Sequence, residues 1–284
     1  MTRRSTSPIT LVKRQQAEWA ARRGTTMDPA HALYTAKLAD NLFVPLSAKT
    51  RQNFEQGSGD ELALKMRALH SSSALAVNVF EHWRQRAEFS ALTRALGLAQ
   101  PIVGLRFEEQ FKNGLPGIPP NLDVVLDLAD GSIVAIESKF LEPYSAHAHG
   151  FKEKYFENPD ELWAGSGFAN CQALAGRLQS GETAFRWLNA EQLLKHIVGL
   201  AKSAKKPWSL WYLWYAVPGE ATEHHAAEVA ELAQIMAADG IGFRSMTYQE
   251  LFAGLKSEAE VGDAEYVRYL AERYFDAART DVVY

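Results

Sequence analysis

Cysteine is almost absent from this 284-residue chain, which contains only Cys171. A single cysteine cannot form an internal disulfide, and it excludes a zinc site built from several cysteines. The surrounding letters FANCQALAG are typical of the buried face of a helix, so we interpret Cys171 as a core residue and not as a nucleophile. This cysteine usage fits a reducing compartment, and we expect a cytoplasmic protein.

Long apolar runs and an excess of positive charge are also missing. No apolar run approaches the roughly 20 residues of a membrane-spanning helix, and the N-terminus lacks the apolar block of a secretory signal, so we expect no membrane partner. The formal net charge is -4, which excludes a coat protein that binds nucleic acid through a wide basic surface. It does not exclude an enzyme whose carboxylates are neutralised by divalent cations.

The pattern along the chain indicates one composite domain with three parts. Residues 1–28 are basic, with six Lys/Arg against Glu18 alone in the first 23, and we interpret them as a frayed arm. Residues 29–100 indicate a helical N-terminal layer. Residues 101–284 alternate between strand-like and helix-like patterns and end in two further helices. Two apolar runs in this part, WSLWYLWYAV and IGFRSMTY, flank a helical segment, which predicts two parallel strands.

The stretch NLDVVLDLADGSIVAIESKF, residues 121–140, carries charges inside two apolar runs. The turn letters LADGS predict a β-hairpin at Asp130-Gly131. A charge in an apolar run is costly unless it is paired, hydrogen-bonded or bound to a metal. The charged residues are Asp123, Asp127, Glu137 and Lys139. We expect Asp127, the nearer acid to the turn in the first run, to satisfy a loop.

Two registers of this hairpin are open. A two-residue turn places Asp123 opposite Ser138. A three-residue loop with Gly131 in the left-handed conformation pairs Leu128 with Ser132, and it places Asp123 opposite Glu137 with Cβ atoms about 5 Å apart. Only the second register gathers both carboxylates and the lysine, which lies two residues after Glu137 on the same strand face.

Such a cluster has a specific chemistry. Two neighbouring carboxylates repel each other, so that one takes up a proton or a cation binds between them. Hard oxygen ligands in a compact arrangement favour Mg2+ or Mn2+. A lysine beside the cation can orient an attacking water and stabilise charge that develops on a phosphate. The second register therefore predicts a metal-dependent phosphodiester hydrolase.

Asp123, the hairpin and Glu137-Ser138-Lys139 resemble the PD-(D/E)XK nuclease superfamily. IESKF is the only place where an acid stands two residues before a lysine, although Leu122 replaces the proline of the literal PD. The resemblance covers about residues 105–250. It implies an α/β fold, with a restriction-endonuclease-like α-β-β-β-α-β core around a mixed central sheet and a helical N-terminal extension.

The same resemblance implies roles for the clustered residues. Asp123, Glu137 and the Ser138 carbonyl would bind Mg2+ or Mn2+, and Lys139 would position the hydrolytic water.

Further residues are implicated by shorter motifs. The letters QLLKH resemble the Q-x-x-x-(Y/H) element of some branches, so Gln192 would hold the hydrolytic site together and His196 would share its helix; a solvated helix face is the open alternative. Glu108 or Glu109 matches the acid that many members place on the helix before the first core strand. We expect Glu109 to bind a second cation or water.

The pair His147 and His149 has zinc-like spacing but no third His or Cys nearby, so we expect a loop over the active site there.

These patterns predict a Mg2+-dependent nuclease that acts on a nucleic acid, which we expect to be DNA, with water as the nucleophile and a 3′-hydroxyl leaving group. The alternatives are a non-catalytic nucleic-acid-binding or assembly module that keeps the nuclease fold, and a hydrolase of another phosphoester. Because the chain is acidic, we also expect a protein partner, either a second copy in a homodimer or an accessory protein that helps to deliver the substrate.

Overall fold

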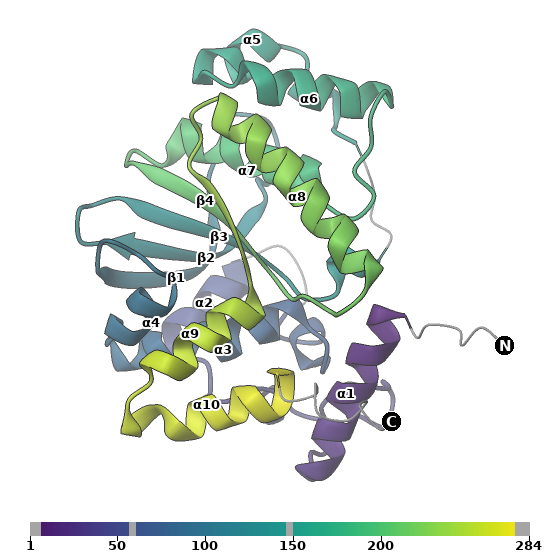
Figure 1. The fold of residues 1–284 in the computed structure, drawn as a ribbon, viewed down its shortest axis with the longest axis vertical. Helices are drawn as coiled ribbons and strands as arrows, with labels where there is room; N and C mark the ends of the chain where they lie inside the picture. The colour runs from purple at the N-terminus through teal and green to yellow at the C-terminus, as the bar shows by residue number, and fades with distance from the viewer. Residues whose placement is uncertain (1–6, 57–60, 146–149, 276–284) are drawn as a thin grey trace, which may run out of the picture.

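The computed structural model describes residues 7–56, 61–145 and 150–275. A five-stranded mixed sheet lies between two layers of helices, so the predicted α/β class is confirmed (Figure 1). The strands follow one another across the sheet in chain order. They are β1 (Ile102–Gln110), β2 (Asn121–Leu128), β3 (Ile133–Lys139), β4 (Trp208–Trp214) and β5 (Phe243–Thr247). The proposed loop histidines His147 and His149 lie outside the described residues.

The sheet is antiparallel in its first half and parallel in its second. β1, β2 and β3 pair antiparallel, whereas β3, β4 and β5 pair parallel. The parallel pairing predicted for the last two strands is confirmed, because helix α8 (Glu220–Ala238) connects them. β4 is buried over most of its length, as expected for a strand covered by helices on both faces.

Each face of the sheet has its own apolar core. One face packs on α1 (Pro8–Arg22), α2 (Ala48–Gln56), α3 (Ser72–Arg86), α4 (Ser90–Ala95), α9 (Tyr248–Glu258), α10 (Ala264–Leu270) and a π-helical turn (Ala271–Phe275). The other face packs on α5 (Pro159–Leu162), α6 (Ala169–Ser180), α7 (Ala190–Ser203) and α8. Cys171 is buried in this second core, as predicted. Among the described residues, no helix combines the length and apolar character needed to cross a membrane.

The interpretation of residues 1–28 as a frayed arm is wrong for residues 8–22, which form α1. Ser7 caps this helix by accepting a hydrogen bond from the Thr10 N–H. Trp19 is buried, and the guanidinium of Arg273 lies 4.3 Å from its ring centroid. Arg273 also donates to the Gln16 side chain at 3.1 Å. Contacts with the far end of the chain therefore fold a segment whose own composition is basic and polar.

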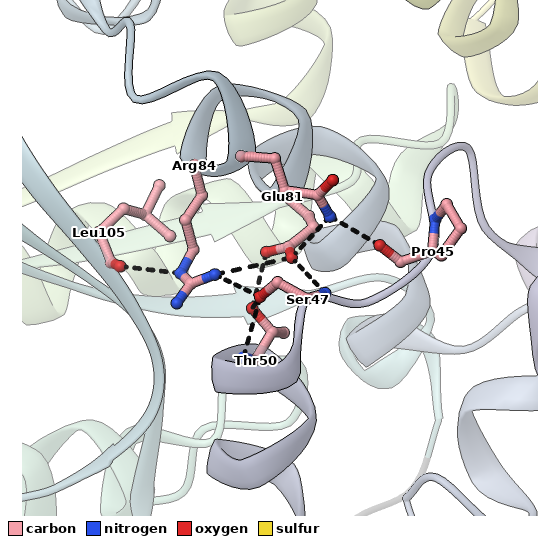
Figure 2. A network of polar contacts seen from close by, with 7 residues as sticks. Pro45, Ser47, Thr50, Glu81, Arg84 and Leu105 are labelled. Carbon is pink, nitrogen blue, oxygen red and sulfur yellow. Dashed lines mark hydrogen bonds and ion pairs between the residues drawn. The ribbon is translucent and has the colours of Figure 1, made fainter.

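A buried glutamate fixes the N-terminal layer to the sheet (Figure 2). Glu81 of α3 is fully buried, and its two oxygens accept hydrogen bonds from the Ser47 N–H at 2.9 Å and the Thr50 hydroxyl at 2.8 Å. Arg84, one turn later, bonds to Ser47 and to the Leu105 carbonyl of β1. The charge of Glu81 is thus compensated, since buried charges require partners. The network holds α2 and the loop before it against α3 and β1.

Candidate active site at the open end of the hairpin

The β2–β3 hairpin adopts the register of the three-residue loop. The Leu128 N–H donates to the Ser132 carbonyl at 2.9 Å, and the Gly131 N–H donates to the Leu128 carbonyl. Gly131 has a φ of 83°, a left-handed conformation that glycine adopts at no steric cost. Of the two registers that the sequence left open, the structure therefore has the one in which Gly131 is left-handed.

This register sets what happens at the opposite end of the hairpin. The paired residues run from Asp127 and Ile133 to Val124 and Ile136. One step further in the same register, Asp123 faces Glu137. The ladder ends there, and the Asp123 carboxylate accepts a hydrogen bond of 2.6 Å from the Ser138 N–H. Two acids therefore meet where the strands part.

Asp127, the fourth charged residue, pairs with Arg106 and Lys206 at 3.1 Å and 3.3 Å. We expected Asp127 to hydrogen-bond to a loop, but it belongs to an ion-pair network at the surface.

Glu137 lies between the side chains of Lys139 and His196. Its Oε1 is 2.5 Å from Lys139 Nζ, and its Oε2 is 3.0 Å from His196 Nε2 of α7, although the second pair is not aligned as a hydrogen bond. Glu137 and His196 are 1% and 2% exposed. Burial alone would raise the pKa of Glu137, but the charges of Lys139 and His196 outweigh it and lower the pKa to about 2. The carboxylate therefore stays ionised.

Asp123 has the opposite electrostatic balance. Burial and the neighbouring Glu137 charge raise its pKa well above the usual range, against the smaller opposing effect of Lys139. Burial alone would lower the pKa of Lys139, but the surrounding carboxylates raise it above its ordinary value, and Glu137 has the largest effect among them. The site thus holds one charged lysine and two carboxyl groups that do not both ionise easily without additional positive charge.

A third carboxyl group comes from β1. Glu108 has a φ of 52°, and its Oε2 accepts a 2.6 Å hydrogen bond from the side chain of Asn121 at the start of β2. Burial, together with the charges of Glu61 and Glu137, raises its pKa to about 7. Glu108 therefore lies in the same electrostatic environment as the hairpin carboxylates.

The expectation for Glu109 is not supported by its position. Residues 102–110 form strand β1 and not a helix, and Glu109 pairs with Arg106 at 3.0 Å while 31% of its side chain stays exposed. The left-handed backbone at Glu108 interrupts the alternation of side chains along the strand. Of the two neighbouring acids, Glu108 is the one that the structure brings to the cluster.

Helix α7 carries the predicted Gln192 and His196. His196 is buried against Glu137, so a solvated helix face is wrong for this residue. Gln192 lies one turn earlier and is half-buried, and its main-chain N–H donates to the Asn189 side chain that caps α7. Among the described residues, no hydrogen bond connects the Gln192 side chain with the carboxylates.

Sequence reasoning missed several residues that surround the cluster. The Ser72 hydroxyl, at the start of α3, donates to the Ser138 carbonyl at 3.1 Å, and Tyr248 of α9 shares a 2.5 Å hydrogen bond with the Ser138 hydroxyl. Glu61 lies close enough to raise the pKa of Glu108. Nothing in the sequence links these residues, because they come from elements far from the hairpin.

The donor atoms suit a hard cation. Asp123 and Glu137 offer carboxylate oxygens and Ser138 offers a carbonyl, the ligand types that Mg2+ and Mn2+ prefer. Glu137 Oε2 and Asn121 Oδ1 are buried without a hydrogen-bond partner, which leaves acceptor capacity for a cation. Within the described residues, no three His, Cys, Asp or Glu side chains already converge on one point. A cation here would be held by two carboxylates, a carbonyl and water.

Comparison with known proteins gives one finding. Neither the curated proteins nor the solved structures include a match to this chain. The family described as "Restriction Endonuclease associating with ARP" matches residues 13–275, which is most of the chain and includes every strand and helix described above except the first five residues of α1. The match relates the protein to restriction endonucleases, and the chain belongs to this REase-ARP family.

Proposed function

We propose that the protein is a metal-dependent nuclease that hydrolyses phosphodiester bonds of DNA. The observation that carries this proposal is the hairpin register, which brings Asp123 opposite Glu137 with Lys139 on the same strand face. Family membership supports it. As part of the proposal, β1, β2, β3 and β4, with the helices between them, correspond to the PD-(D/E)XK core.

Asp123, Glu137 and the Ser138 carbonyl would hold Mg2+ or Mn2+. The cation would supply a bound water of lowered pKa and would neutralise charge on the phosphate. The ammonium of Lys139, which its carboxylate neighbours keep charged, orients the attacking water and stabilises the extra negative charge on the phosphoryl oxygens. The water oxygen forms a bond to phosphorus while the bond to the 3′-oxygen breaks, and that oxygen leaves with a proton as a hydroxyl.

Three residues act around this centre in the proposal. His196 fixes the orientation of Glu137 from its other side. Glu108 takes the role that the sequence assigned to Glu109, to bind a second cation or a water, because it is the β1 acid beside the cluster. Gln192 is proposed to contact the substrate or solvent at the start of α7.

The experiment is a cleavage screen with duplex, single-stranded and branched DNA and with RNA, each with Mg2+ and with Mn2+. We expect cleavage by the wild type and a loss of roughly 10²- to 10³-fold in Lys139→Ala, the size seen when one transition-state stabiliser is removed. Asp123→Asn and Glu137→Gln should also lose activity. The amide substitutions are chosen because they remove the charge but keep an oxygen that can accept a hydrogen bond, as Glu137 does from Lys139, which an alanine would not.

Asp127→Asn is the matched control. Asp127 lies on the same strand as Asp123 but pairs at the surface with Arg106 and Lys206, so this variant should cleave as the wild type does. If no substrate is cleaved with either metal, the nuclease assignment is wrong. Independently of activity, Mn2+ should raise the melting temperature of the wild type but not of Asp123→Asn, since a ligand that binds only the folded state stabilises it.

A second candidate is a non-catalytic module. The family description includes association with ARP, and the two oxygens of Glu137 already lie against Lys139 and His196. A protein that binds nucleic acid or a partner without cleavage would satisfy both observations. The proposal also includes a protein partner, either a second copy or an accessory protein, and a cytoplasmic location that fits the single buried cysteine.

A further inference from the structure

A cavity of about 620 Å3 opens beside the N-terminal end of α8. Its walls come from the segment before α7, from the residues between β4 and α8, and from the start of α1, which lies next to this end of α8 (Figure 1). Arg186, Trp187 and His224 are among its lining residues. The volume falls within the roughly 300–1,000 Å3 typical of small-ligand sites.

Two aromatic rings in this cavity lie parallel. The planes of the Trp187 indole and the His224 imidazole are 5° from parallel, and the rings are stacked with centroids 6.3 Å apart. The guanidinium of Arg186 lies 4.9 Å from the Trp187 ring centroid. The His224 side chain is 56% exposed, so the rings are accessible from solvent. A flat ligand can lie against these parallel faces, and the cation beside them adds attraction.

The segment that carries Trp187 is held rigidly. The carboxylate of Glu228 on α8 accepts hydrogen bonds from three successive main-chain N–H groups, those of Arg186, Trp187 and Leu188, each at 2.8 Å. Leu188 is also fully buried. A ligand would therefore meet a preorganised surface and would lose little affinity to ordering of the loop.

The charges around the cavity distinguish between kinds of ligand. Among the described residues that line it, Arg186 is the only Lys or Arg, and Glu220 and Glu228 lie on the same rim. Glu220 pairs with His224 at 3.3 Å, and the Glu228 charge is directed at main-chain N–H groups. This rim repels a polyphosphate, whereas it tolerates a planar group with a single phosphate near Arg186.

The cavity and the candidate active site lie at the same edge of the sheet. The residues after β4 form one wall, and the last residue of β4, Trp214, pairs with Lys139 at the end of β3. Another wall is formed by Arg186 and Trp187, which lie in the chain just before α7, and His196 of α7 contacts Glu137. In open sheets, ligands bind at the carboxyl ends of parallel strands. The cavity and the carboxylate cluster therefore both lie beyond the carboxyl ends of β3 and β4.

We propose that this cavity binds an unstacked base of a single nucleic-acid strand, with the base against Trp187 and His224 and its phosphate near Arg186. The identity of the ligand rests on the proposed nuclease function. Aromatic faces combined with a cation are the chemistry by which proteins bind single strands, and extrusion of a base from the stack exposes its face.

The test measures binding by fluorescence anisotropy with the full chain in EDTA, so that no strand is cut. The probes are a labelled single-stranded dT oligomer, an abasic oligomer of equal length and a duplex, with thymidine monophosphate as a competitor. Trp187→Ala should bind the dT oligomer about tenfold more weakly than the wild type, the effect of one base stacked on an aromatic ring. Its affinity for the abasic oligomer should match that of the wild type, and Trp187→Phe should restore most of the loss.

Additional variants protect the test against misfolding. His224→Ala removes an exposed side chain and should weaken dT binding in the same direction. Arg186→Ala should weaken both oligomers, whereas Arg51→Ala, at an exposed position of α2, should weaken neither beyond the general effect of a lost charge. Equal affinity of the wild type, Trp187→Ala and His224→Ala for the dT oligomer would overturn the proposal. Preference for the free mononucleotide over the strand would overturn the assignment to a strand.

The two proposals fail in different ways. If the wild type cleaves no substrate but binding of the dT oligomer still depends on Trp187, the nuclease assignment is wrong and the base-binding assignment of the cavity is supported. If cleavage depends on Asp123 and Lys139 but substitution of Trp187 does not change oligomer binding, the assignment of the cavity is wrong and the nuclease assignment is supported.

Discussion

The Asp123 carboxylate, and not a main-chain carbonyl of β2, accepts the hydrogen bond from the Ser138 N–H. Its Oδ2 accepts a 2.6 Å hydrogen bond from the Ser138 N–H just beyond the last residue pair of the hairpin. Since Ser138 stands between Glu137 and Lys139, this bond ties one acid to the middle of the motif that carries the other acid and the lysine. The carboxylate therefore has a structural task in addition to the proposed binding of a cation.

Two substitutions of Asp123 should separate these tasks. Asp123→Asn keeps an oxygen acceptor for the Ser138 N–H, and the loss of charge costs little because burial and the Glu137 charge already raise the Asp123 pKa. Its unfolding free energy should stay within about 1 kcal/mol of the wild type, whereas Asp123→Ala should lose about 1–3 kcal/mol through the unsatisfied N–H. Urea unfolding in EDTA measures both. Equal destabilisation of the two variants would contradict the structural task.

The second prediction is that the free energy of unfolding depends on pH through Glu108. Its pKa rises from 4.5 to about 7 on folding, so the folded state holds a proton that the unfolded state releases. The free energy of unfolding should therefore fall as pH rises from about 4.5 to 7, by at most about 3 kcal/mol at 1.36 kcal/mol per pH unit.

The variant Glu108→Gln should lose this dependence, so its stability relative to the wild type should rise across the same pH window. Urea unfolding between pH 4 and 8 in EDTA gives the comparison. Glu109→Gln, whose carboxylate pairs with Arg106 instead, is the neighbouring control. Parallel pH curves for Glu108→Gln and the wild type would show that Glu108 is not in the environment described.

The hairpin and its motif were accessible from sequence because they are local. The letters LADGS and the two apolar runs predicted the hairpin, and the parallel strands followed from an apolar-helical-apolar order. The choice between two registers needed the structure, in which Gly131 is left-handed and Asp130 accepts hydrogen bonds from both the N–H and the hydroxyl of Ser132.

Other parts of the site depend on contacts between distant segments. Strand alternation gave no means of choosing between Glu108 and Glu109, because the left-handed backbone at Glu108 is a local exception to it. The helix at residues 8–22 is stabilised by contacts with Arg273, more than 250 residues away. The backbone at Glu108 has no signature in the surrounding letters, whereas the start of the helix has one in Ser7 and Pro8, which are typical N-cap and first-turn residues.

The third prediction concerns the stability of variants at Gly131 in the hairpin turn. A Cβ at Gly131 would meet no atom within 4 Å, so the cost of Gly131→Ala comes from the left-handed backbone alone, roughly 1–2 kcal/mol. Asparagine tolerates this conformation better, so Gly131→Asn should cost less than Gly131→Ala. Denaturant unfolding ranks the variants. A Gly131→Ala protein as stable as the wild type would mean that the register does not depend on this conformation.

The fourth prediction concerns the contact that holds α7 in place. A Cβ at Gly199 would lie 2.5 Å from the Phe111 carbonyl oxygen, which belongs to the backbone directly after β1. Gly199→Ala should therefore push α7 away from the sheet and destabilise the protein by about 1–3 kcal/mol, the usual cost of overpacking.

The same displacement would move His196, one turn earlier on α7, away from Glu137, so any cleavage activity should fall together with stability. Gly176, in the middle of α6, is the matched control because a Cβ there meets nothing within 4 Å. Gly176→Ala should raise the unfolding free energy by roughly 0.5–1 kcal/mol, since alanine is the better helix former. Thermal and denaturant unfolding of the two variants should give opposite signs, and the same sign for both would reject the close approach of α7 to Phe111.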